Sequence, residues 1–183
     1  MAIAIDQPIG LVLADPHPVM LDGLQKDLLE WPEFRVKACV RDGDTAMRAI
    51  NEHQPDYIVM DLPLDKRNGL SLIQDLQLMH FNTQPIVFTA SPIADVMRAI
   101  DLGVRGLVSK NKPKHILARC IHAVHGGQAW LDQDLTQETM ALLLQMDKKR
   151  NRVSQVLTPR EVDVARMVTE GWPSTTPAFG WWH

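Results

Sequence analysis

Short, uninterrupted apolar runs alternate with longer segments of helical period over the first two-thirds of the chain. The first run, Ile9–Ala14, is continuous and therefore suits a strand that is buried on both faces of a sheet. Comparable runs follow at 57–60, 86–88 and 107–109, each after a segment with apolar residues three and four positions apart. Because a crossover helix is needed to join neighbouring parallel strands, this alternation predicts a doubly wound α/β fold.

A further strand and the first helix have signals of their own. Phe34–Val40 alternates apolar with polar residues, which predicts a strand near one edge of the sheet. Pro18 suits a first helical turn, and Leu21, Leu24 and Leu28 then recur on one helical face. We therefore expect a five-stranded parallel sheet covered by helices.

The net charge and the cysteines limit the partners and the compartment. A formal net charge of -3 gives no overall basic footprint for nucleic acid. Cys39 and Cys120 lie far apart and outside any metal-ligand spacing, which favours a reduced, cytoplasmic environment. The sequence shows neither a signal-peptide pattern nor the roughly 18 consecutive apolar residues of a membrane span, so we expect a cytoplasmic protein without a membrane partner.

Polar residues stand at the carboxyl ends of the predicted strands. Asp15 and Asp61 directly follow the first and third strands, Thr89 ends the fourth, and Lys110 follows the fifth. In a parallel sheet these ends meet in one crevice, where open α/β folds bind their ligands. Carboxylates that hold Mg²⁺, an ammonium group and a hydroxyl are the groups that a phosphoryl-accepting aspartate needs around it. The pattern predicts an acidic, phosphoryl-accepting pocket centred on Asp61.

Four stretches carry a resemblance to a known family, and each contains one of these pocket residues. They are residues 13–18 (LADPHP), 59–69 (VMDLPLDKRNG), 88–91 (FTAS) and 106–110 (GLVSK). Together they resemble the receiver domain of two-component response regulators, a flavodoxin-like fold, over about residues 8–127. The resemblance implies that Asp61 is the phosphoacceptor and that Asp15 and Asp61 hold Mg²⁺. It also implies that Thr89 is the switch hydroxyl and Lys110 the phosphate-binding lysine.

The later part of the chain extends the resemblance. Residues 157–171 (LTPREVDVARMVTEG) are similar to the opening of a LuxR-type helix-turn-helix domain, so the whole chain resembles a NarL/FixJ-type transcriptional regulator. This implies a sensor histidine kinase as partner, a homodimer, and a regulatory role rather than turnover catalysis. The expected domains are a receiver at 1–127, a linker helix at 128–153, the first part of the all-α output domain at 154–171 and an atypical, disordered tail at 172–183.

The expected output segment contains only one helix of the DNA-reading pair. Thr158, Pro159 and Glu161 form a capping-box start, and that helix stops at Gly171. Reading DNA requires a second helix in the major groove, and residues 172–183 have no helical period. We therefore expect no DNA-binding residues in this chain, and DNA binding only through a complete output domain. The linker helix either packs on its own domain or forms a dimer.

Three positions depart from the family pattern. Pro16 stands where the family usually has a second acidic residue that binds Mg²⁺, so we expect a weaker Mg²⁺ site. Leu107 stands where the family generally has an aromatic switch residue, and it has no ring or hydroxyl to report movement of the switch hydroxyl. Asp65, followed by Lys66 and Arg67, replaces a proline and predicts a more charged and mobile, surface-solvated loop.

Three functional hypotheses follow. The first is a response regulator controlled by phosphorylation of Asp61, and the second is a receiver that acts without phosphate as a dimerisation or interaction module. The third, an enzyme or flavin-type redox protein on the same fold, is disfavoured because Pro16, His17 and Pro18 replace a glycine-rich phosphate loop after the first strand. We expect His17 and the other histidines to be solvated or capping residues rather than metal ligands.

Overall fold

The computed structural model describes residues 7–113 and 115–132 of the chain. All of them fall within one structural unit, Met1–Thr139. In chain order the elements are β1 (Ile9–Ala14), α1 (Pro18–Leu29), β2 (Phe34–Val40), α2 (Gly43–His53), β3 (Tyr57–Met60), α3 (Gly69–Leu78), β4 (Gln84–Thr89), α4 (Ile93–Asp101), β5 (Gly106–Ser109), α5 (His115–His125) and β6 (Trp130–Leu131). The expected alternation of strands and helices is therefore present.

The strands form one sheet in the order β2-β1-β3-β4-β5-β6, and every neighbouring pair is parallel. The first five strands have the doubly wound order of flavodoxin-like folds, in which the chain reverses direction across the sheet between β1 and β3. The predicted fold class is confirmed. β1 is buried along its whole length, whereas β2 alternates between sheltered and exposed residues, as the sequence pattern indicated for an edge strand.

The structure adds one strand to the five that we expected. β6 pairs with β5 through Gly106 with Trp130 and Leu107 with Leu131. Residues 130–131 lie in the range 128–153 that was predicted to be a linker helix, so that prediction is wrong at these two positions. A two-residue strand has no periodicity to detect, because alternation needs at least four residues to be visible. The rest of the predicted linker, the output segment and the tail lie outside the described residues.

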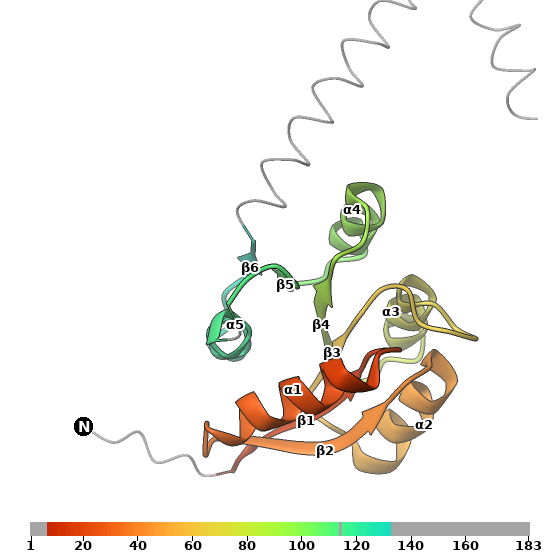
Figure 1. The fold of residues 1–183 in the computed structure, drawn as a ribbon. Helices are drawn as coiled ribbons and strands as arrows, with labels where there is room; N and C mark the ends of the chain where they lie inside the picture. Colours follow the sequence, from red (N-terminus) through yellow and green to blue (C-terminus); the bar gives the residue numbers. More distant parts are fainter. Residues whose placement is uncertain (1–6, 114, 133–183) are drawn as a thin grey trace, which may run out of the picture. The chain divides into compact units, whose positions relative to one another are not determined.

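Helices cover both faces of the sheet (Figure 1). α1 and α5 pack on one face, where Leu21, Leu24 and Leu28 form the predicted apolar stripe of α1. α2, α3 and α4 pack on the other face around side chains such as Ile50 and Leu72, both with no exposed surface. The sheet is therefore the middle layer of three, and the loops at its carboxyl edge are held by packed helices on both sides.

Helix starts fix these loops. Pro18 is in the first turn of α1, as predicted, directly after His17. The Asp42 carboxylate accepts hydrogen bonds from the backbone N–H groups of Asp44 and Thr45 at 3.1 and 3.0 Å and so caps α2. At the start of α3, a Cβ on Gly69 would lie 2.8 Å from the backbone oxygen of Asp61, so only glycine permits this close approach.

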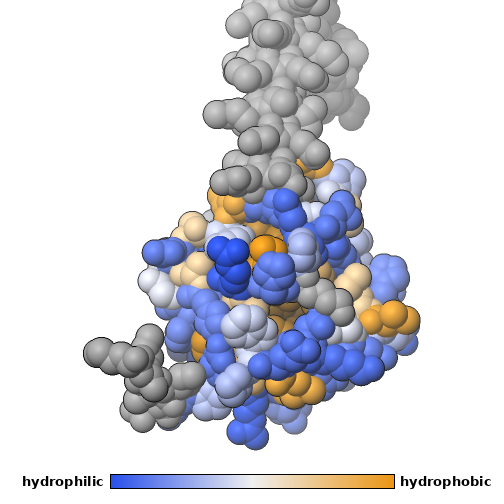
Figure 2. Space-filling model, turned by 60° about the vertical axis from the view of Figure 1, so that its left-hand side comes forward, coloured by the Kyte–Doolittle hydropathy of each residue, from blue (hydrophilic) through white to orange (hydrophobic). Residues whose placement is uncertain are grey.

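The side of the domain on which α5 lies is mostly hydrophilic, with hydrophobic residues scattered among the polar ones (Figure 2). Scattered apolar residues of this kind are ordinary on a protein surface. Within residues 7–113 and 115–132, no helix combines the length and the apolar character that crossing a membrane requires.

Candidate functional site: an acidic pocket at the carboxyl edge of the sheet

The ends of four strands bring the predicted pocket residues together. Asp15 follows β1, Asp61 follows β3, Thr89 is the last residue of β4, and Lys110 follows β5. Parallel pairing sets their level, because the backbone N–H of Asp61 donates to the carbonyl of Ala14 at 2.9 Å and that of Lys110 donates to the carbonyl of Thr89 at 2.9 Å. The residues therefore lie side by side at the point where the strand order reverses, which is the usual ligand position in such sheets.

The Lys110 ammonium joins the two carboxylates. Its Nζ lies 2.6 Å from Asp15 Oδ2 and donates a hydrogen bond to Asp61 Oδ2. Only 3% of the Asp15 side chain and 4% of the Asp61 side chain are exposed, so these charges are largely withdrawn from water. Burial by itself lowers the pKa of Lys110, but the hydrogen bonds and charges of Asp15 and Asp61 outweigh it and hold that pKa above its usual value. Lys110 is therefore a fixed cation at the centre of the pocket.

The second oxygen of Asp61 is held by neutral donors. Thr89 Oγ1 donates to Asp61 Oδ1 at 2.5 Å, and the backbone N–H of Leu62 donates to the same oxygen at 2.8 Å. Thr89 Oγ1 also lies 2.8 Å from the hydroxyl of Ser91 and accepts a hydrogen bond from the Ser91 backbone at 3.1 Å. Thr89 thus links Asp61 to the loop between β4 and α4.

His17 belongs to the same pocket, which the sequence did not indicate. Its side chain is 70% exposed, as expected of a solvated histidine, yet its Nδ1 lies 3.0 Å from Asp15 Oδ1. Ligand atoms of Asp15, His17 and Asp61 all lie within 4.8 Å of one another. Two buried carboxylates and one accessible imidazole form a donor set that fits a divalent cation. The only sequence signal was the position of His17, two residues after Asp15 in the first strand-to-helix loop.

Two histidines of α5 have contacts away from the pocket. His122 Nε2 lies 2.8 Å from Glu33 Oε1, and its ring packs against Trp31 and Phe34 with centroid distances of 5.6 and 4.8 Å. His125 lies 3.3 Å from the hydroxyl of Tyr57. His122 is partly buried, so the expectation of a solvated or capping side chain is incomplete for it, whereas His125 is exposed, as expected.

Two of the positions that depart from the family pattern have clear structural settings. Leu107 is fully buried in β5, where it belongs to the core on the side of α2, α3 and α4. It pairs with Val87 of β4, two residues before Thr89. Pro16 is half-buried between Asp15 and His17 and has no side-chain ligand atom. The pocket therefore has one carboxylate on this loop.

The charged loop after Asp61 lies at the surface, as expected, since Asp65 and Lys66 are exposed, but its two cations have carboxylate partners. Lys66 pairs with the capping carboxylate of Asp42 at 3.1 Å. Arg67 bridges two helices, with its guanidinium 3.3 Å from Asp44 of α2 and 2.8 Å from Asp75 of α3. The pairs with Asp42 and Asp44 form because the fold brings the start of α2 next to the loop, which the residue order alone does not reveal.

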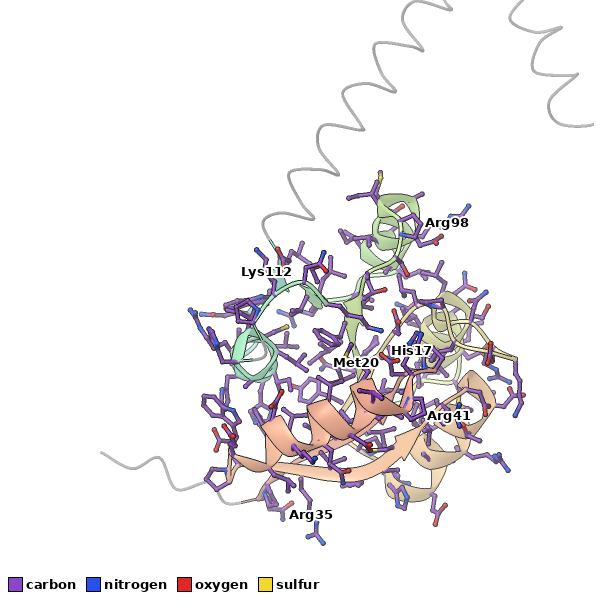
Figure 3. All side chains as sticks on the ribbon, in the orientation of Figure 1. His17, Met20, Arg35, Arg41, Arg98 and Lys112 are labelled. Atoms are coloured by element: carbon purple, nitrogen blue, oxygen red, sulfur yellow. The ribbon has the colours of Figure 1, made fainter. Side chains whose placement is uncertain are left out.

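A cavity of about 660 Å³ opens over Asp61. Its wall combines residues of α1, α4 and the loops after β1, β3, β4 and β5, among them His17, Met20, Asp61, Arg98 and Lys110. Figure 3 labels His17, Met20 and Arg98. The cavity gives a small ligand access to the buried carboxylate from the solvent. Its lining combines the cations Arg98 and Lys110 with the carboxylates Asp61 and Asp95.

A doubly wound sheet with two aspartates, a threonine and a lysine at its carboxyl edge defines a class of signal-receiving domains, and comparison with known proteins agrees. Residues 11–121 match the family "Response regulator receiver domain". The chain belongs to this family.

The relatives place the whole chain among LuxR-family response regulators. The chain is 26% identical over 169 residues to the nitrate/nitrite response regulator protein NarL of Escherichia coli (strain K12), covering 92% of this chain and 78% of that protein. It is 25% identical to the transcriptional regulatory protein YdfI of Bacillus subtilis (strain 168), with 92% and 79% covered. A crystal structure of a two-component response regulator of the LuxR family from Aurantimonas sp. SI85-9A1 superimposes with a TM-score of 0.69 at 25% identity, covering 75% of this chain and 99% of that chain. The predicted NarL/FixJ-type resemblance is confirmed.

Proposed function

We propose that the chain is a response regulator that accepts a phosphoryl group on Asp61 from a sensor histidine kinase. The observation that carries this proposal is the set of contacts on the Asp61 carboxylate, which is buried, bonded to Lys110 and Thr89, and reached through a cavity. The family membership supports the same function, because the matched residues 11–121 include all four pocket residues.

In the proposed step, an oxygen of the Asp61 carboxylate attacks the phosphorus atom of the donor. A new bond forms between that oxygen and phosphorus, the bond from phosphorus to the donor atom breaks, and the donor leaves with that electron pair. Lys110, held 2.6 Å from Asp15, is positioned to offset charge on the transferred oxygens. A turn of the Thr89 hydroxyl from Asp61 towards a new phosphoryl oxygen would carry the change to Ser91 and the β4–α4 loop.

Asp15 and Asp61 are the residues that would hold Mg²⁺ in this function, since both carboxylates are buried and their ligand atoms lie within 4.8 Å of each other and of His17. A bound Mg²⁺ offsets negative charge on the incoming phosphoryl oxygens. Pro16 supplies no side-chain ligand atom, so this chain has to complete the site with fewer carboxylates.

The proposed output is control of transcription by a homodimer that binds DNA through a complete helix-turn-helix domain. The supporting observation is that the relatives matched along 92% of this chain are a response regulator and a transcriptional regulatory protein. The segments that would carry this output, 154–171 and the linker residues 133–153 before it, lie outside the described residues. A gel-shift titration with promoter DNA tests whether these 183 residues bind DNA; sequence-specific binding would contradict the expectation that this chain has no DNA-binding residues.

Intact-mass measurement tests the phosphorylation directly. The full chain is incubated with Mg²⁺ and a small phosphodonor, in parallel with Asp61→Asn and with Asp22→Asn, a control that removes an exposed carboxylate from α1. We expect a gain of one phosphoryl group in the wild type and in Asp22→Asn, and none in Asp61→Asn. A gain that persists in Asp61→Asn would place the phosphoryl group on another residue.

A second function is favoured by a specific observation. Both oxygens of Asp61 already have donors, because Oδ1 accepts from Thr89 and Leu62 while Oδ2 accepts from Lys110. A pocket satisfied in this way can be stable without phosphate, so the chain would act as a dimerisation or interaction module. The absence of any mass gain, together with an unchanged oligomeric state after incubation with the phosphodonor, would favour this function over the first.

A further inference from the structure

The candidate metal ligands of the pocket include one nitrogen ligand, the imidazole of His17, beside the carboxylates of Asp15 and Asp61. The loop after β1 carries Asp15, then Pro16, whose side chain has no ligand atom, then His17. The backbone N–H of His17 donates to Asp15 Oδ1 at 2.9 Å, which folds the loop back over the carboxylate. This turn brings the His17 imidazole to the mouth of the cavity beside the N-terminal end of α1 (Figure 3).

The spacing of His17 and Asp15 matches that of two ligands of one metal ion. Neighbouring ligand atoms of an octahedral ion with bonds of about 2.1 Å lie about 3.0 Å apart. His17 Nδ1 and Asp15 Oδ1 are 3.0 Å apart. A cation bound between these two atoms would therefore require little movement of either side chain.

Lys110 limits which oxygens remain for a cation. Its ammonium engages Asp15 Oδ2 and Asp61 Oδ2, so the remaining oxygen of Asp15 faces His17 rather than Lys110. Asp15, Asp61 and Lys110 together carry one net negative charge, which is a weak attraction for a divalent ion that binds through oxygen alone. A nitrogen ligand adds affinity that does not depend on further negative charge.

We propose that His17 is a metal ligand of this pocket, and that it shifts the preference of the pocket from Mg²⁺ towards first-row divalent cations that accept imidazole, such as Co²⁺ and Zn²⁺. Mg²⁺ binds oxygen ligands almost exclusively, whereas imidazole is a good ligand of the later first-row ions. This inference deepens the proposed function, because it names the cation of the same pocket, but the binding itself requires no phosphoryl transfer.

Calorimetric titration of the full chain with CoCl₂ and with MgCl₂ at one fixed pH tests the proposal. The variants are His17→Ala and His53→Ala, the latter a control at the end of α2, away from the carboxyl edge of the sheet. We expect His17→Ala to lower the Co²⁺ association constant at least about tenfold and to change that of Mg²⁺ less than about twofold. His53→Ala should leave both constants unchanged. An equal Co²⁺ constant in wild type and His17→Ala, or no measurable Co²⁺ binding, would overturn the proposal.

Two further measurements locate the ion. The visible absorption of bound Co²⁺ should change in intensity and position in His17→Ala, because the nitrogen ligand is lost. Asp61→Asn should weaken both Co²⁺ and Mg²⁺ binding, and Co²⁺ binding that is unaffected by Asp61→Asn would place the ion outside the pocket and refute the assignment. No phosphodonor is present in these titrations, so a failed phosphorylation test and a failed metal test are separate results.

Discussion

Replacing Lys110 with methionine should destabilise the domain by leaving two buried carboxylates without their shared cation. The Nζ of Lys110 lies 2.6 Å from Asp15 Oδ2, and at an effective dielectric constant near 20 such a pair is worth about 6 kcal/mol before desolvation. Removing one partner of a buried pair typically costs about 3–5 kcal/mol. Since the cavity over Asp61 lets water reach the unpaired carboxylates, we expect a loss at the lower end, about 3 kcal/mol.

The assay is urea unfolding of the full chain, monitored by far-ultraviolet circular dichroism, in buffer that contains a chelator. With a slope of about 2 kcal/mol/M, a loss of about 3 kcal/mol lowers the urea midpoint by about 1.5 M. Lys26→Met is the matched control, because Lys26 is an exposed lysine on α1, and its midpoint should stay within about 0.3 M of the wild type.

A double-mutant cycle identifies the cause. In an Asp61→Asn background only Asp15 is left unpaired by Lys110→Met, so the substitution should cost at least about 1 kcal/mol less than in the wild type. If Lys110→Met matches the Lys26→Met control, or costs the same in both backgrounds, the ammonium does not stabilise the carboxylates and the electrostatic account of the pocket is wrong.

Four other predictions concern the domain outside the pocket. Gly106→Ala should lower stability by about 1–3 kcal/mol in urea unfolding, because its Cβ would lie 2.9 Å from Ile86 Cγ1 in the core; unchanged stability would mean that β4 and β5 separate easily. Burial raises the pKa of the Cys120 thiol to about 12 from 9.0, so above pH 9 this thiol ionises in the unfolded chain but stays neutral in the folded one. The free energy of unfolding should therefore fall as the pH rises from about 9 towards 12, and it should fall less in Cys120→Ala. At pH 8, a thiol reagent should modify exposed Cys39 quickly and buried Cys120 only on unfolding, and equally fast reaction of both would contradict the burial. Arg67→Met should lower the free energy of unfolding by less than about 1 kcal/mol. It should nevertheless speed amide exchange in the loop after Asp61, measured by hydrogen–deuterium exchange, and unchanged exchange would show that the ion pairs do not hold this loop.

The arrangement of the pocket was predictable because it follows from secondary structure alone. Asp61 comes directly after a four-residue apolar run, and such a run in a parallel sheet can end only at the carboxyl edge. The same reasoning places Asp15, Thr89 and Lys110 at that edge, where the structure brings them into contact. Their chemical roles remain predictions, since contact does not by itself show phosphoryl transfer.

The features that the sequence did not reveal depend on how the loops and helices are arranged in space. His17 reaches Asp15 only because a backbone hydrogen bond turns the loop back on itself. Arg67 finds its partners on two helices that are distant from each other in sequence. β6 is a two-residue strand that forms because β5 offers it a neighbour. In each case the residue type is uninformative until the tertiary neighbours are known.

The two edge strands of the sheet also affect how readily this domain aggregates at high concentration. In the part of the chain that the structure describes, the sheet ends with β2 on one side and with β6 on the other. β2 carries the exposed charged residues Arg35 and Lys37, and β6 has only two residues. A charged strand and a very short strand are both poor templates for docking of a foreign strand. The domain is therefore protected against edge-to-edge aggregation by its own borders, and neutral substitutions at Arg35 and Lys37 would weaken that protection.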